Sequence, residues 1–109
     1  MTTRAKPIPE GYHTATPYLI ITPAAKAIEF YKAVFGATEL ERLATPGGKV
    51  GHAEIQIGDS RIMLADEFPE WDARSPKTIG GSPVSIRLHV EDVSPEEMKK
   101  RAAALFGMS

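Results

Sequence analysis

The order of apolar and polar residues predicts one compact unit over residues 16–67. An apolar run rich in β-forming residues predicts a strand over 16–22, and residues 24–35 carry apolar side chains at helical spacing. A weaker strand is predicted over 38–44. The last part of the unit is a hairpin, in which 52–57 alternates apolar and polar side chains and 61–65 returns after a Gly-Asp-Ser turn. These elements follow each other in the order β-α-β-β-β.

The predicted helix has start and stop signals in the sequence. Thr22 is placed to cap the first turn, and Pro23 suits the first helical position. Gly36 follows the last apolar position and predicts a left-handed end to the helix.

A second pattern near the C-terminus predicts a further strand and a second helix. Residues 84–91 alternate between apolar and polar side chains, which is typical of a half-buried strand. Ser94, Pro95 and Glu97 form a capping box with a first-turn proline, so a helix is predicted to begin at residue 95. The apolar positions of this helix are Met98, Ala102, Leu105 and Phe106.

Together these elements predict an α+β fold. We divide the chain into an irregular arm over 1–15, the β-α-β-β-β module over 16–67, a loop or linker over 68–83, and the strand and amphipathic helix over 84–109. The loop contains prolines and glycines that interrupt regular structure.

Composition narrows the function classes. The chain has 109 residues, with 13 basic and 14 acidic side chains, and its basic residues are scattered except for Lys99-Lys100-Arg101. Neither nucleic acid nor an anionic membrane is therefore an expected partner.

The absence of cysteine excludes disulfides, thiolate metal sites and cysteine nucleophiles. No apolar run approaches the ~20 residues of a membrane span, and the N-terminus lacks a signal-peptide pattern, so we expect a cytoplasmic protein.

Three stretches carry a resemblance to a known family: IITPAAKAIEFYKAVFGAT, HAEIQIGDSRIMLADE and GGSPVSIRLHVEDV. In combination and order they resemble the vicinal oxygen chelate (VOC) superfamily of glyoxalases, bleomycin-resistance proteins and dioxygenases, and within it the PhnB-like subgroup. The resemblance implies a cup built from two β-α-β-β-β modules that encloses a metal and a small ligand.

The resemblance also suggests a shortened chain, joined at HVEDV (89–93), that lacks most of the second module. We expect a homodimer to restore the cup. The alternative is an ordinary strand-to-helix connection.

The resemblance also bears on metal binding. It places Thr16 and Ser85 at two of the family's metal-ligand positions, and neutral hydroxyls are poor ligands for a divalent metal. We therefore expect no metal and no other cofactor, and we assign no catalytic residue. Asp66 and Glu67 lie near a position where the family often has an acidic ligand, but an exposed pair of loop carboxylates is the favoured interpretation.

Five residues are the candidate ligand-binding residues: His52, Glu54, Gln56, Arg87 and His89. The first three share one strand face, which is either a pocket wall or a solvated surface. The other two share a face of the predicted strand over 84–91, where an anion-binding arginine or a titrating histidine would fit, as would charges that protect an edge strand. Trp71 either covers a cavity, anchors a partner or simply packs.

These features favour a small-molecule protein of the glyoxalase and bleomycin-resistance type that binds a ligand or has lost its activity. The alternative is a metal-dependent lyase, isomerase or dioxygenase whose site is built across a dimer. A third hypothesis is an assembly module without a ligand. The sequence leaves enzymatic activity open, because a fold supports many functions.

Overall fold

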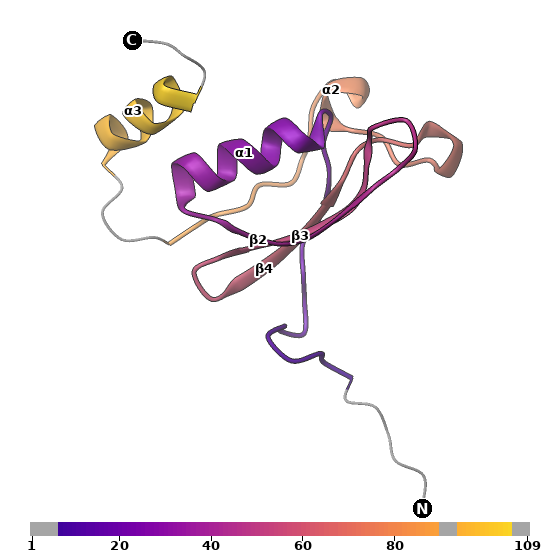
Figure 1. Ribbon diagram of the computed structural model, residues 1–109, viewed down its shortest axis with the longest axis horizontal. Helices are drawn as coiled ribbons and strands as arrows, with labels where there is room; N and C mark the ends of the chain where they lie inside the picture. Colours follow the sequence, from indigo (N-terminus) through magenta and orange to yellow (C-terminus); the bar gives the residue numbers. More distant parts are fainter. Residues whose placement is uncertain (1–6, 90–93, 106–109) are drawn as a thin grey trace, which may run out of the picture.

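The computed structural model describes residues 7–89 and 94–105 (Figure 1). Its elements are β1 (Tyr18–Ile20), α1 (Ala24–Phe35), β2 (Thr38–Ala44), β3 (Val50–Ile57), β4 (Ser60–Ala65), a 3-10 turn (Pro69–Trp71), α2 (Pro76–Ile79) and α3 (Pro95–Leu105). The four strands form one sheet in the order β1-β4-β3-β2. β1 runs parallel to β4, whereas β3 is antiparallel to both of its neighbours. The predicted α+β fold and the β-α-β-β-β order are confirmed.

Helix α1 covers one face of the sheet (Figure 1). The buried core lies between them, and its fully buried side chains include Ile28 of α1, Ile55 of β3 and Leu64 of β4. Ala53, Ile55 and Ile57 all belong to this core, as their alternation with polar residues predicts. The polar residues between them consequently face the other side of the sheet.

The prediction for the end of α1 is confirmed, whereas the prediction for its start is not. Gly36 ends the helix in the left-handed conformation with φ 68°, as predicted, and its N–H donates to the carbonyl of Lys32. The predicted Thr22 cap is wrong. Pro23 occupies the N-cap position without a side-chain cap, and the Thr22 hydroxyl donates to Asp66 instead. The carboxylate of Asp66 accepts from the Ala24 N–H, so the residue that follows β4 replaces the local cap.

The predicted strand over 84–91 is also wrong for the part that the structure describes. Residues 84–89 form no strand, and the Val84 side chain is 70% exposed. A strand needs backbone partners along its length. The Val84 N–H instead donates to the Ser82 side chain, in a local turn. The segment passes beside β1 and the start of β4 but pairs with neither strand. Residues 90–93, which include most of HVEDV, lie outside the described residues.

The 68–83 segment is better ordered by local contacts than its composition suggests. Besides the 3-10 turn and α2, it is fixed by Glu67, whose carboxylate accepts from the Ser75 N–H. This hydrogen bond lowers the pKa of Glu67 below its ordinary value. Trp71 is 74% exposed and packs its ring beside that of Phe68, with 5.1 Å between the ring centroids. Trp71 is therefore mostly exposed and contacts one ring, and its role stays a prediction.

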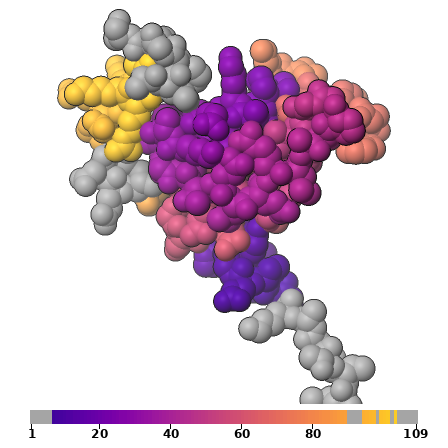
Figure 2. Space-filling model, viewed as in Figure 1, coloured from indigo at the N-terminus to yellow at the C-terminus, as the bar shows by residue number. Residues whose placement is uncertain are grey.

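Helix α3 lies beside α1 (Figures 1 and 2), and Arg101 donates to the Val34 carbonyl at the end of α1. Its predicted cap is confirmed, because the Glu97 N–H donates to the Ser94 hydroxyl. The side chains of its predicted apolar positions lie outside the described residues. No described helix is long and apolar enough to cross a membrane.

Candidate functional site

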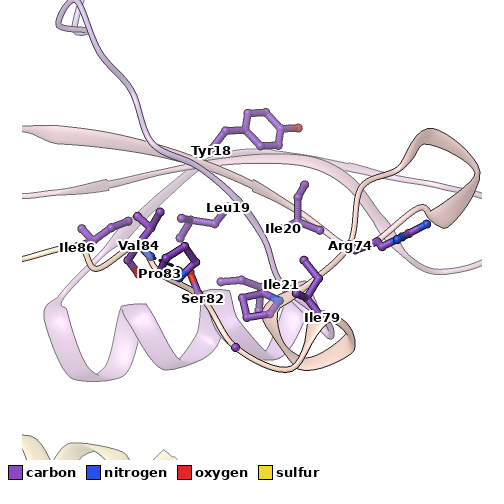
Figure 3. A pocket seen from close by; sticks show the side chains of 12 residues that line it. Tyr18, Leu19, Ile20, Ile21, Arg74, Ile79, Ser82, Pro83, Val84 and Ile86 are labelled. Atoms are coloured by element: carbon purple, nitrogen blue, oxygen red, sulfur yellow. Dashed lines mark hydrogen bonds between the residues drawn. The ribbon is translucent and has the colours of Figure 1, made fainter.

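The face of the sheet turned away from α1 carries polar side chains that could bind a ligand or a metal. We call it the open face. Alternation along β3 and the strand register place the following residues on it: Tyr18 of β1, Glu41 and Leu43 of β2, His52, Glu54 and Gln56 of β3, and Arg61 and Met63 of β4. Figure 3 shows the ring of Tyr18 on this side of the sheet and Leu19 on the side of α1. The predicted set His52, Glu54 and Gln56 therefore does share one surface.

Two tyrosines hold the central side chains of the open face. The hydroxyl of Tyr18 lies 3.0 Å from Nδ1 of His52, and the two ring centroids are 5.6 Å apart. Tyr12 donates its hydroxyl to a carboxylate oxygen of Glu54. Since Tyr12 belongs to the arm that precedes β1, this contact places part of the arm against the sheet. Both contacts fix side chains of β3 in defined orientations.

Two carboxylates face each other across β2 and β3. Glu41 is the register partner of Glu54, and like charges in this position repel. Neither carboxylate has an ion pair within the described part of the chain. Ligand atoms of Glu41, Glu54 and His52 all lie within 4.8 Å of one another. An imidazole and two carboxylates form a donor set that suits zinc or another first-row divalent metal.

The remaining predicted residues are not brought to the centre of the open face. Gln56 uses its amide locally and donates to the Gly58 carbonyl. Arg87 and His89 are exposed in the segment after α2 and belong to no strand. Arg87 lines a separate small cavity at the start of β4, together with Arg61. The binding role of all five predicted residues stays a prediction.

A larger cavity lies along the free edge of β1 (Figure 3). Its volume is about 430 Å³, and it separates β1 from the chain around α2 and the segment that follows. Leu19, Ile21 and Val84 contribute apolar walls, whereas Arg74 supplies a charged rim. This cavity contains none of the predicted ligand-binding residues.

Four residues of the site were missed by sequence reasoning: Tyr12, Tyr18, Glu41 and Arg61. A signal existed for Tyr18, because it is a polar-tipped aromatic at the start of a predicted strand. Nothing local indicates Tyr12, which lies in an irregular arm. The role of Glu41 depends on its register with β3, and a β-bulge at residue 40 shifts that register.

Comparison with known families agrees with this topology. Residues 13–104 match the family described as Glyoxalase/Bleomycin resistance protein/Dioxygenase superfamily. The chain belongs to this superfamily. Uncharacterized proteins of Mycobacterium bovis and Mycobacterium tuberculosis are 41% identical to it over 81 residues, which is 72% of this chain and 53% and 48% of theirs. This glyoxalase-superfamily chain thus spans about half the length of these relatives.

A solved structure shows the same fold. The gene product of Arabidopsis thaliana At5g48480 superimposes with a TM-score of 0.63, covering 86% of this chain and 73% of its own, at 22% sequence identity. At that identity the likeness concerns the arrangement of helices and strands.

Proposed function

We propose that this glyoxalase-superfamily chain is a small-molecule binding protein whose ligand lies against the open face of the sheet. The observation that carries the proposal is the set of tyrosine contacts on that face. Tyr18 orients His52 and Tyr12 orients Glu54, so polar groups are held in place on a surface that none of the described helices covers. Preorganised side chains of this kind lower the entropic cost of binding.

The charge of the open face indicates the class of ligand. Glu41 and Glu54 place two carboxylates next to each other, and Tyr18 adds an aromatic ring that is 48% exposed. A carboxylate and an aromatic face together favour an organic cation. We therefore infer an amine-bearing or guanidine-bearing molecule with an apolar body.

A single open sheet gives such a ligand only one wall. We propose that two copies of the chain place their open faces toward each other and form the cup of a PhnB-like or bleomycin-resistance-like homodimer. In this arrangement Leu43, which is 54% exposed beside His52, would lie within the interface between the two copies.

Light scattering on a gel-filtration peak across a dilution series tests the dimer, and titration calorimetry with a panel of aromatic amines tests the ligand class. We expect a dimer that saturates with one such amine, and at least about tenfold weaker binding after Glu54→Gln. Glu70→Gln, which removes an exposed carboxylate from the 3-10 turn, is the matched control and should bind normally. A monomer that no amine saturates would refute the proposal.

The cluster of Glu41, His52 and Glu54 favours a second candidate, a metal-dependent enzyme of the glyoxalase type. These three residues would hold the metal, which would polarise a substrate carbonyl as a Lewis acid. Tyr18 would then orient the imidazole through Nδ1, leaving Nε2 for coordination. The first-strand position that the family resemblance assigns to a ligand is Thr16, so the donor set comes from other strands.

Zinc titration of the whole chain separates the two candidates. One zinc per chain, lost in His52→Ala and retained in His13→Ala, would support the metal-dependent candidate. His13 is an exposed histidine of the arm and serves as the matched control. If the unmodified chain shows no saturable zinc binding, the binding-protein proposal stands alone.

A further inference from the structure

The structure assigns an oxyanion-binding site to the cavity between the arm, the start of β4 and residues 86–88. This cavity has a volume of about 200 Å³. Arg61 and Arg87 both line it, and they come from parts of the chain that are far apart in sequence. His13 also lines it, and no acidic residue does. The inference concerns a ligand of the opposite charge from the proposed amine, in a cavity that shares Arg61 with the open face.

Arg61 is the first line of evidence. Its Nε is buried without a hydrogen-bond partner among the described residues, and its guanidinium forms no ion pair there. A buried donor without a partner is rare in native proteins and calls for an explanation, such as an ion or a water. The cost of leaving it unpaired is removed when an anion accepts its hydrogen bonds.

The surroundings of Arg61 fix the orientation of its guanidinium. The group lies over the ring of Tyr12, with 4.9 Å from Cζ to the ring centroid. The backbone at Gly11 approaches it so closely that a Cβ there would clash with the guanidinium. A guanidinium held between a ring and a backbone keeps its fork of donors in one plane, which suits bidentate binding of a carboxylate or phosphate.

Arg87 is the second, independent line of evidence. It is exposed and has no ion pair or hydrogen bond within the described chain, yet it lines the same cavity. Two positive side chains that line one small cavity both attract an anion placed between them. The hydroxyl of Thr16 also lines the cavity and can donate to the same oxygens, whereas the hydroxyl of Ser60 donates to Asp59. The ligand group is therefore a small oxyanion, either free phosphate or the acidic group of an organic molecule.

Titration calorimetry with inorganic phosphate, and separately with acetate, tests the inference on the whole chain at constant ionic strength. We expect saturable binding of one anion per chain. Arg61→Gln and Arg87→Gln should each weaken that binding roughly tenfold or more, since each removes charge-assisted hydrogen bonds. Tighter binding of phosphate would identify a tetrahedral anion, and tighter binding of acetate a carboxylate.

Two further variants keep the result specific. Arg61→Lys retains the charge but loses the planar fork, so it should also weaken binding. Arg74→Gln removes an exposed arginine that forms an ion pair with Asp72, and it should leave anion binding unchanged. Because Arg87 is exposed and unpartnered, its variant should keep the far-ultraviolet circular dichroism of the original chain.

Three outcomes would overturn the inference: no saturable binding of either anion, an unchanged affinity in either Arg61→Gln or Arg87→Gln, or an equal loss in Arg74→Gln. The titration uses neither an amine nor a second ligand. A chain that binds phosphate but fails the amine screen would therefore refute the proposed function while leaving the oxyanion site intact.

Discussion

The carboxylate of Asp66 caps helix α1 at Ala24, 42 positions away in the chain. One carboxylate oxygen accepts the Ala24 N–H at 2.9 Å, and the other accepts the Val50 N–H at 2.7 Å. Asp66 is only 5% exposed. A single buried side chain at the end of β4 thus joins the start of the helix to the start of β3. The sequence had favoured an exposed loop carboxylate at this position.

Replacing this carboxylate should destabilise the fold. Asp66→Ala leaves two buried backbone donors unpaired, so we expect the free energy of unfolding to fall by roughly 3 kcal/mol. Asp66→Asn keeps one acceptor and should cost less. Urea unfolding followed by circular dichroism measures both. Asp72→Asn changes a carboxylate that is 85% exposed and should stay within about 0.5 kcal/mol. Equal effects at positions 66 and 72 would contradict the capping role.

The end of α1 gives a second stability prediction. Gly36 has φ 68°, a conformation that costs other residues about 1 kcal/mol, so Gly36→Ala should lower the free energy of unfolding by about that amount. No atom lies within 4 Å of the added methyl group, so the cost is conformational and not steric.

Gly47→Ala is the matched control for this substitution. Gly47 also has open space around it but lacks a positive φ, so its change should be neutral or slightly stabilising. Thermal and urea unfolding of the two variants give the comparison. A loss at Gly47 as large as that at Gly36 would mean that the left-handed conformation is not the cause.

Local patterns predicted the parts of the fold that depend on local physics. The alternation of Ala53, Ile55 and Ile57 identified the buried face of β3, and Gly36 identified the end of α1, because periodicity and backbone strain act within a few residues. The capping by Asp66 escaped prediction, since it depends on contacts between distant segments. The same holds for the alternating stretch 84–89, which forms no strand although its pattern is regular.

The candidate site was predicted only in part for a similar reason. Alternation placed His52 and Glu54 on one face, but the register between β2 and β3 was needed to bring Glu41 beside them. Arg87 was predicted to bind an anion from a strand that does not form. Arg61 lines the same cavity only because the tertiary fold brings the two segments together. Side-chain clusters from several elements require knowledge of how those elements pack.

The ion pair between α1 and β2 predicts a dependence of stability on pH. The hydrogen bond from Lys32 lowers the pKa of Glu39 below its ordinary value of 4.5, with Arg42 acting in the same direction. A carboxylate with a lowered pKa stabilises the fold at pH values above 4.5, and this contribution is lost as the pH falls through its folded pKa.

Glu39→Gln should therefore lower stability at neutral pH by at most about 1 kcal/mol, because the pair is partly solvated. The difference from the unmodified chain should vanish in acid. Urea unfolding across a pH series measures it, and Glu70→Gln, an exposed carboxylate without a recorded ion pair, should show no such convergence. A difference that persists at acidic pH would assign the effect of Glu39→Gln to lost packing.

The last prediction concerns how two copies would meet. Leu43 lies opposite His52 on the open face and is 54% exposed. If the open faces pair, Leu43→Glu places a buried charge in the interface and loses the burial of a leucine. The dissociation constant of the dimer should therefore rise at least about tenfold. Ile79→Glu, an exposed apolar residue of α2 at 67%, is the matched control. Light scattering across a dilution series measures both. Dissociation by Ile79→Glu alone would place the contact along the cavity beside β1, and the open face would then not be the surface that joins the copies.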